Sequence, residues 1–394
     1  MGLRGFLVRC HRLQRNYSQE GLCHGICAVS YLSKLEQGKV QAADEIYQAL
    51  FHRLGIVFQE NEEWLAVWKE KLEELASAWF YGEQSEAFEL EKQMENLLNS
   101  PLCVDVLLIK ALYAKEHADK PLTSASVFLP YMQDAQRFMY HFLCAGQALQ
   151  SREEQNLSAI LAQLQEAQKY GGWSILYQMK GEVYALMGDY SQALHHHLKA
   201  YDLASEEGFL PCMIDASMHI ANCYSAMHAE GVMLMYYERC EHLCRSSKNK
   251  QMQAHVWYNI GSTYQQWGDF QKALPLLLKA YQILDDTFLC CHKLALLYEQ
   301  LNRKKEGLRY VQEMERQLDS HEADGRREIV QFVRYRYETA VDAEVYIDCL
   351  YTLCDSSRYF HGFSQFHQSY LIAALKKKRR YKEAMKLMEK TIFS

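Results

Sequence analysis

Glycine and proline are scarce in this sequence, and long apolar runs are missing from it. The 394 residues include 19 glycines and 5 prolines, about half of the usual combined frequency of roughly 12%. This scarcity argues against turn-rich all-β folds and against disordered or collagen-like chains. No stretch approaches the roughly 18 consecutive apolar residues of a membrane-spanning helix. With 49% apolar and 23% charged residues, the composition predicts a soluble, mostly helical protein.

The thirteen cysteines lack the features of a secreted disulfide scaffold. Their spacing is irregular, and residues 1–9 contain no apolar signal segment with a cleavage site. We therefore expect reduced thiols in a cytoplasmic protein. Cys10, Cys23, Cys27 and His24 have no paired Cys-x-x-Cys spacing, so helix packing is favoured over metal binding. We expect neither a metal nor a cofactor.

Charge is unevenly distributed along the chain. Residues 1–56 carry seven basic and four acidic side chains, a balance of +3, whereas the remainder has a balance of −9. A small basic module on an acidic body is typical of a phosphate-binding head attached to a sensor or scaffold. We place the boundary near residue 60, with a head at 1–60 and a body at 61–394.

Local signals in the head predict short helices. A first helix is expected over residues 3–15. Ser18 is suited to cap a second helix over 19–25, whose first-turn N–H groups can donate hydrogen bonds to a phosphate oxygen. A third helix is expected over 29–36, followed by Gly38 in the position of a C′ glycine. Two short helices around a tight turn suit the major groove of DNA.

Linked motifs in the head identify a family. In order they are Gly5-x-x-Val8-Arg9-x-x-Arg12, Tyr17-Ser18-Gln19-Glu20-x-Leu22 and Ile26-Cys27-x-x-Ser30-Tyr31-Leu32-Ser33-Lys34-Leu35-Glu36-x-Gly38-Lys39. Together they closely resemble the Xre-type, lambda-repressor-like helix-turn-helix. The resemblance implies a domain that binds double-stranded DNA.

The same resemblance implies roles for single residues. Gln19 matches a glutamine that contacts phosphate, and Lys39 lies in a turn that meets the DNA backbone. Arg12 and Glu36 match a structural ion pair. His11 stands where the family has an apolar residue, and a half-buried, hydrogen-bonded histidine is favoured there over a pH switch. The positions that meet base edges, with their flanking residues, are Val29, Ser30, Lys34, Tyr31 and Ser33.

The acidic body contains an internal repeat. A small residue followed three positions later by tyrosine recurs at intervals of 40, 40 and 34 residues, as Gly181/Tyr184, Ala221/Tyr224, Gly261/Tyr264 and Ala295/Tyr298. Periods of this length are typical of helix-turn-helix solenoids. The copies with Gly-Asp turns, at 188–189 and 268–269, resemble tetratricopeptide repeats, and the resemblance is clearest over 173–315. It implies an all-α fold in which a helix-turn-helix domain precedes a right-handed α-solenoid.

A solenoid of this kind has a concave face lined by the first helix of each repeat. Amide, hydroxyl and aromatic groups predominate at the inward positions and can hold the backbone of an extended peptide. Asn222 is the first choice for a residue that binds the peptide backbone, because its side-chain amide can donate and accept a hydrogen bond at the same time. The alternative interpretation is a hydrated surface without a ligand. The inward positions are Gln178, Glu182, Met218, Asn222, Ser225, His255, Tyr258, Ser262, Gln265, His292 and Glu299.

Two conspicuous clusters have simpler explanations. Consecutive side chains of 195–197, three histidines, point in different directions on a helix, so a metal site there is disfavoured. The basic run 376–380 is expected to be a solvated turn, with auxiliary contact to the DNA backbone as the alternative. No nucleophile–base pairing, paired carboxylates or metal spacing indicates an enzyme.

The combination of head and body resembles the Rgg, PlcR and NprR group of peptide-sensing regulators. The resemblance implies a homodimeric cytoplasmic transcription regulator whose groove binds a short imported peptide. Binding would change the placement of two heads on half-sites about 34–36 Å apart. The alternative is a DNA-binding protein whose repeats bind a partner protein, as a scaffold or antagonist.

Overall fold

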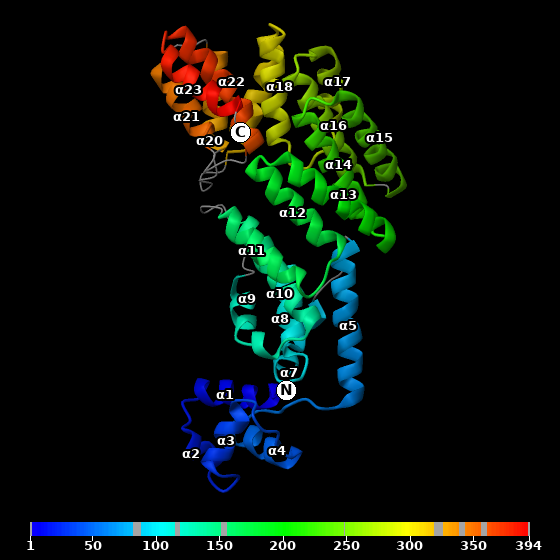
Figure 1. Cartoon of the computed structure of the whole chain (residues 1–394), viewed down its shortest axis with the longest axis vertical. Coiled ribbons are helices and arrows are strands. Elements are labelled where there is room, and N and C mark those ends of the chain that lie inside the picture. The colour runs from blue at the N-terminus through cyan, green and yellow to red at the C-terminus, as the bar shows by residue number, and fades with distance from the viewer. Residues whose placement is uncertain are drawn as a thin grey trace. The chain divides into compact units, whose positions relative to one another are not determined.

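The structure, a computed structural model, describes residues 2–81, 88–114, 119–150, 156–247, 249–318, 326–338, 343–355 and 361–392. Within these ranges every regular element is a helix and no strand occurs. Two compact units make up the chain, one of Met1–Ala148 and Ala162–Gly172 and the other of Leu149–Leu161 and Trp173–Ser394 (Figure 1). The boundary expected near residue 60 separates a head from a body by their functions, and it stays a prediction.

The first unit begins with four short helices whose ends follow the local sequence signals. Ser18 accepts a hydrogen bond from the backbone of Gly21 and caps the second helix. Gly38 has a φ of 69° just after the third helix, as expected of a C′ glycine. The predicted boundaries are confirmed to within two residues. The helices are α1 (Leu3–Gln14), α2 (Gln19–Cys23), α3 (Val29–Glu36) and α4 (Asp44–Arg53).

The apolar core of these four helices continues into the helices that follow. Phe6 lies with its ring centroid 5.2 Å from that of Phe128 and 4.7 Å from that of Tyr131. Buried Leu22 and Leu35 belong to the same cluster as residues of α8. The remaining helices of the unit are α5 (Glu62–Tyr81), α6 (Phe88–Lys92), α7 (Met94–Leu98), α8 (Cys103–Tyr113), α9 (Asp119–Ser126), the 3₁₀ turn η1 (Leu129–Tyr131), α10 (Asp134–Gln150) and α11 (Leu157–Gln168), the last two reaching into the other unit.

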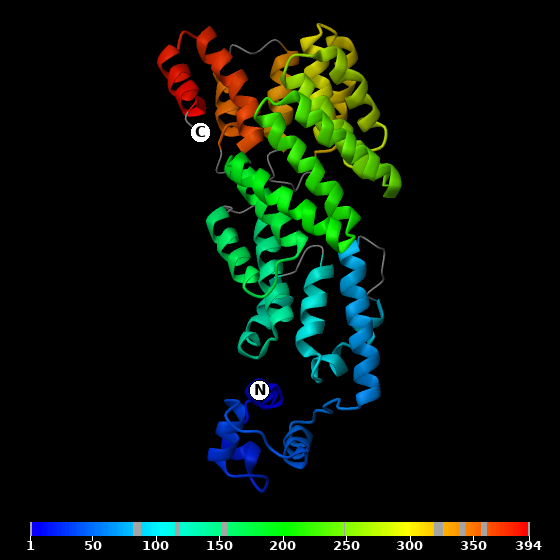
Figure 2. The same ribbon diagram turned by 45° about the vertical axis from the view of Figure 1, so that its right-hand side comes forward.

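The second unit is a series of helical hairpins, visible in both views (Figures 1 and 2). The helical-repeat architecture expected from the sequence is confirmed. The pairs of the repeat region are α12 (Ser174–Met187) with α13 (Tyr190–Glu207), α14 (Leu210–Ala226) with α15 (Glu230–Ser247), α16 (Lys250–Gln266) with α17 (Phe270–Tyr281), and α18 (Phe288–Gln300) with α19 (Lys304–Arg316).

The small residues of the repeat motif allow the paired helices to approach closely. A Cβ atom on Gly261 would come within 2.8 Å of Leu277. A Cβ atom on Gly181 would come within 2.5 Å of the ring of His197. Any larger residue at these positions would force the two helices of the hairpin apart.

A left-handed residue recurs in the turns of five hairpins of the described chain. Gly188 and Gly268 have φ values of 83° and 84°, and the following Asp189 and Asp269 cap the next helix. The Gly-Asp turns expected from the sequence are confirmed. In other hairpins a non-glycine residue takes this conformation, with φ of 57–59° at His228, Asn302 and Arg379.

The remaining helices of the second unit cover α18. Phe332 of α20 and Leu371 of α22 are fully buried in the same apolar cluster as Leu294 and Leu297. These hairpins lie beyond residues 173–315, where the repeat motif is clearest, and only the turn at 381–384 is repeat-like in sequence. These helices are α20 (Arg326–Tyr337), α21 (Glu344–Leu353), α22 (His361–Lys377) and α23 (Tyr381–Ile392).

No helix within the described ranges is both long enough and apolar enough to cross a bilayer.

Candidate functional site

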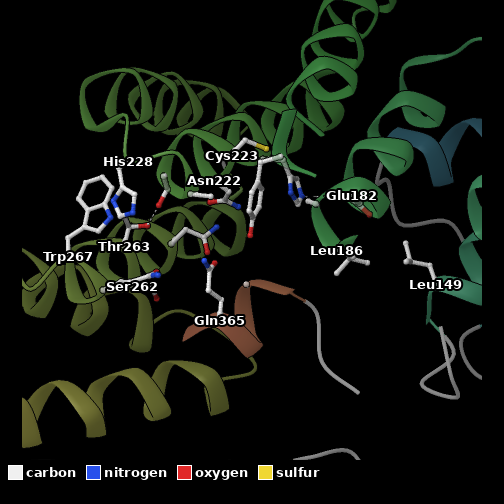
Figure 3. A pocket seen from close by; sticks show the side chains of 18 residues that line it. Leu149, Glu182, Leu186, Asn222, Cys223, His228, Ser262, Thr263, Trp267 and Gln365 are labelled. Carbon is white, nitrogen blue, oxygen red and sulfur yellow. Dashed lines mark hydrogen bonds and ion pairs between the residues drawn. The ribbon is translucent and has the colours of Figure 1, made fainter. Parts of the chain in front are cut away.

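A cavity of about 600 Å³ lies in the second unit, within the range of roughly 300–1,000 Å³ that is typical of ligand sites. One wall comes from α12, α14 and α16, the first helices of three consecutive hairpins (Figure 3). Tyr190 of α13, Leu149 at the end of α10 and two residues of α22 add to the lining, together with His228 and Trp267 from the turns after α14 and α16. The lining residues are Leu149, Glu182, Ala185, Leu186, Tyr190, His219, Asn222, Cys223, Ser225, Ala226, His228, Asn259, Ser262, Thr263, Gln266, Trp267, Gly362 and Gln365.

Asn222 is held in a fixed orientation at the centre of this wall. Tyr237 of α15, which is 1% exposed, donates its hydroxyl proton to Oδ1 of Asn222 at 2.5 Å. Because that oxygen is engaged, Nδ2 is the group left to donate to a ligand. The hydroxyl oxygens of Ser225 and Thr263 lie 3.0 Å apart and connect α14 to α16. The wall therefore presents preorganised polar groups.

The charge of the cavity wall is negative. Glu182 is the only Asp, Glu, Lys or Arg among the lining residues of the described chain, and 35% of its side chain is exposed. Burial raises the pKa of Glu182, and it raises the pKa of nearby Asp215 to about 6. Nε2 of His219 lies 3.9 Å from the carboxylate of Glu182, and burial lowers the pKa of this histidine. At neutral pH the carboxylate therefore has no lysine or arginine beside it in the wall.

A pair of stacked imidazoles supports the wall from behind. The rings of His197 and His219 have centroids 4.8 Å apart and an interplanar angle of 15°. Nδ1 of His197 lies 3.0 Å from Oε1 of Gln178, and burial lowers the pKa of His197 well below its usual value. His197, neutral and tightly packed, therefore connects α13 to α12 and α14, the helices that form this part of the wall.

The structure brings four of the eleven inward positions into the cavity wall. They are Glu182, Asn222, Ser225 and Ser262. As ligand contacts they remain predictions.

Two more of the eleven are buried and connect helices to one another. Gln178 is 7% exposed and Gln265 is 3% exposed. Nε2 of Gln265 donates to the backbone oxygen of Lys293 at 3.1 Å and to Oε1 of Gln300 at 3.0 Å. Gln265 thus connects α16 to α18 and does not line the cavity.

The two positions on α18 are covered by the helices that follow. His292 is 1% exposed, and its ring stacks on that of His367 with centroids 5.4 Å apart. The carboxylate of Glu299 lies 2.6 Å from the guanidinium of Arg336, and 17% of the Glu299 side chain is exposed. The structure places neither residue in the cavity lining.

The last three positions also lie outside the cavity wall. Met218 and Tyr258 pack against the apolar core of the repeats. His255 is exposed to solvent. These placements follow from the curvature of the helix stack, which the repeat motif does not encode.

Sequence reasoning missed several residues of the wall. Asn259 and Gln266 lie one helical turn on either side of Ser262, so the i−3 and i+4 spacing on α16 could have identified them. Gln365 of α22 faces the cavity from a distant part of the sequence (Figure 3). No local pattern points to it, because the helix stack itself brings α22 to this site.

In the head, one ion pair holds the first and third helices together. Arg12 and Glu36 are 8% and 2% exposed, and two nitrogens of Arg12 donate to the two carboxylate oxygens at 2.6 and 2.9 Å. Nε2 of Gln19 donates to Glu36 at 2.7 Å. The nearby His11 is half-buried, and burial lowers its pKa.

The third helix of the head keeps one face in solvent. Val29 is 43% exposed, and Ser30, Lys34 and Lys39 are also exposed, whereas Tyr31 is half-buried. Ser33 is half-buried and its hydroxyl accepts a hydrogen bond from Gln37. The residues expected to meet DNA therefore lie on or beside one helix, and DNA contact by them remains a prediction.

The cysteine and histidine clusters have structural surroundings. All thirteen cysteines are free thiols, and burial raises the pKa of Cys10 and Cys27. His196 stacks on Tyr184 with ring centroids 5.2 Å apart, while His197 points into the hairpin interface. Across the described ranges no three His, Cys, Asp or Glu side chains form a group that could hold a metal ion.

The basic run 376–380 spans the last two residues of α22 and the turn to α23. Arg380 lies 3.1 Å and Lys378 lies 3.7 Å from the carboxylate of Glu344. Lys376 and Arg379 are exposed. Part of the positive charge is therefore engaged within the turn.

Sequence comparison supports the repeat architecture. A family model described as tetratricopeptide repeat matches residues 254–283, which span most of α16 and all of α17. A search of curated protein sequences gives no match.

Several solved structures have a similar fold. A Rap protein in complex with competence and sporulation factor is 15% identical, with a TM-score of 0.69 over 84% of this chain and 97% of that one. NprR in complex with its cognate peptide NprX is 17% identical, with a TM-score of 0.62 over 82% of this chain and 99% of that one. The apo form of RapI is 13% identical, with a TM-score of 0.53 over 80% and 98%. The similarity at these identities is one of fold.

Proposed function

We propose that this protein is a sequence-specific, DNA-binding transcription regulator controlled by a short signalling peptide. The peptide would bind in the groove of the helical repeats, change the geometry of a homodimer and thereby alter DNA binding. In this proposal residues 1–60 bind DNA in the cytoplasm, and residues 61–394 sense the peptide.

The observation that carries the proposal is the oriented amide of Asn222 in a cavity rich in amides and hydroxyls. An extended peptide carries an N–H and a C=O on each residue, and these need partners when water is displaced. Asn222, Ser225 and Ser262 offer such partners on one wall. The similar fold of NprR, which was crystallised with a peptide, supports this choice of ligand.

The charge of the wall narrows the class of peptide. Glu182 supplies a carboxylate, and no lysine or arginine of the described lining offers a partner for a free peptide carboxylate. We therefore expect the bound segment to bring a cationic group, either its amino terminus or a basic side chain. Its carboxyl terminus should lie outside the cavity.

The head supports the DNA-binding half of the proposal. Residues 1–56 carry a net charge of +3, which favours phosphate, and the exposed Val29, Ser30 and Lys34 lie on one short helix. A helix of this kind is suited to the major groove. In a homodimer two such helices would meet half-sites about 34–36 Å apart.

A peptide library tests the sensing half. Unblocked hexapeptides should include members that bind saturably in calorimetry, and Asn222→Ala should weaken the tightest of them by at least tenfold. Gln253→Ala, which shortens an amide side chain on α16 outside the cavity wall, is the matched control and should bind normally. The absence of any saturable hexapeptide would contradict the proposal. A protein that co-purifies stoichiometrically at high salt would instead favour a scaffold or antagonist.

Operator selection followed by variant binding tests the DNA half. Lys34→Ala or Ser30→Ala should relax base preference, because base edges supply specificity. Gln19→Ala should weaken binding to all sequences, because phosphate contacts are insensitive to sequence. This division of roles would be refuted if all three variants lost the same amount of binding affinity for specific DNA as for random DNA.

A further inference from the structure

Helix α22 forms a second wall of the cavity, opposite the wall built by the repeat helices. Gly362 and Gln365, near its first turn, line the cavity. In Figure 3 the side chain of Gln365 extends from α22 toward the side of the cavity that carries Ser262. The same helix also contacts α12, so it reaches across the groove.

The buried face of α22 fixes the direction in which Gln365 points. His367 is fully buried and stacks on His292 of α18. Nζ of Lys293 lies 3.2 Å from the ring centroid of Phe366, and Nε2 of Gln300 donates to the hydroxyl of Tyr370 at 3.1 Å. These contacts leave α22 no freedom to rotate, so Gln365 is presented to the cavity before any ligand arrives.

The amides that face the cavity have hydrogen-bonding capacity to spare. Within the described chain, no hydrogen bond joins the side chain of Gln365, Asn259 or Gln266 to another residue. Asn222 has only its oxygen engaged, by Tyr237. Each free amide side chain can accept from an N–H and donate to a C=O.

An extended peptide needs partners on two opposite edges. Successive residues of such a chain direct their N–H and C=O groups to alternate sides. In the bound peptide, the N–H and C=O groups of every second residue would face α14 and α16, and those of the residues in between would face α22. A wall on one side only would leave half of these groups without a partner inside the cavity.

We propose that Gln365 binds the backbone of the peptide on the edge opposite to that bound by Asn222, so that the ligand is held between α22 and the repeat helices. This inference rests on the proposed peptide-sensing function. It adds a binding residue from outside the repeat motif, and it makes the ligand a bridge between α12–α16 and α22.

The test combines protein variants with single N-methylation of the peptide. The probe is the tightest hexapeptide from the library, prepared with each backbone N–H methylated in turn. Gln365→Ala should weaken the unmethylated probe about five- to tenfold, the effect of one or two hydrogen bonds. Gln368→Ala, on the same helix but outside the cavity lining, is the matched control and should bind normally. Thermal melts of both variants check that α22 remains folded.

Double-mutant cycles then identify the backbone group that each side chain binds. In Gln365→Ala one N-methylation should lose its effect. Asn222 has only Nδ2 free and would bind a peptide C=O, so in Asn222→Ala one replacement of C=O by the weaker acceptor C=S should lose its effect, with an odd number of residue steps between the two positions. Wild-type affinity of Gln365→Ala, a separation by an even number of steps, or no coupled position for Gln365 would overturn the inference while leaving the peptide-sensing function standing. Failure of every hexapeptide to bind would overturn both.

Discussion

Glu182 and Glu299 occupy comparable inward positions on the first helices of two repeats, yet their surroundings differ completely. Glu182 of α12 lines an open cavity with 35% of its side chain exposed. Glu299 of α18 lies under the C-terminal helices, in an ion pair with Arg336. The repeat register therefore determines which face of a helix a residue occupies, and the course of the helix stack determines whether that face is open.

Removal of the two carboxylates should give the largest contrast. Glu299→Ala should lower the free energy of unfolding by about 3 kcal/mol, because the Arg336 guanidinium stays largely buried without its carboxylate. Glu182→Ala should change it by less than about 1 kcal/mol, because the groove is open to water and no lysine or arginine of the described lining pairs with this carboxylate. Urea unfolding followed by circular dichroism measures both. Similar losses for the two variants would break the comparison.

The groove region should gain stability when the carboxylate of Asp215 is neutralised. Burial raises the pKa of this carboxyl to about 6, above the usual value near 3.9 in an unfolded chain, so ionisation opposes folding at neutral pH. Asp215→Asn should be more stable than wild type by about 2 kcal/mol at pH 8. The advantage should shrink as the pH falls through 6 and vanish below about 4. An advantage that grows with acidity would contradict the assignment.

Around the C-terminal helices, acid should have the opposite effect and lower the stability of the fold. Burial lowers the pKa of His292 well below its usual value and that of His367 to about 3. Below about pH 6.5 these histidines bind protons in the unfolded state but not in the folded state, so the stability of the fold decreases as the pH decreases. His292→Phe should remove about 1.4 kcal/mol of this loss at pH 5.5. Urea unfolding at pH 7.5 and 5.5 compares the two proteins, and an unchanged pH dependence would count against a neutral His292.

Substitutions in the turns of the repeat hairpins and of the C-terminal hairpins should have the smallest effects on stability. Gly268→Ala should cost about 1 kcal/mol, because alanine disfavours the positive φ of this turn. Arg379→Gly should gain about 0.5 kcal/mol for the same reason, reduced by the greater freedom of glycine in the unfolded chain. Differential scanning calorimetry resolves both shifts. Stabilisation by both substitutions would indicate that φ is not the controlling factor.

Local signals were sufficient wherever a few neighbouring residues decide the structure. Ser18 and Gly38 mark helix ends in the head, and Gly188 and Gly268 mark turns between repeat helices. The approach of paired helices at Gly181 also follows from the motif alone. These elements could be predicted because their causes lie within a few residues of sequence.

The site could be predicted only in part, because its second wall is tertiary. Asn222 and Ser262 follow from the repeat register, and both line the cavity. His292 follows from the same register but is buried by α20 and α22, whose hairpins lie beyond the residues where the repeat motif is clearest. Gln365 belongs to one of those hairpins, so nothing near it in the sequence links it to the groove.

The thirteen cysteines, all free of disulfides, give this protein a set of built-in reporters. Cys212 lies on α14 and Cys290 and Cys291 lie on α18, and all three are buried with the pKa raised to about 12. A buried thiol reacts with an alkylating reagent only when its helix opens. Labelling rates at these native positions would therefore record the local opening of the groove helices and of α18 separately.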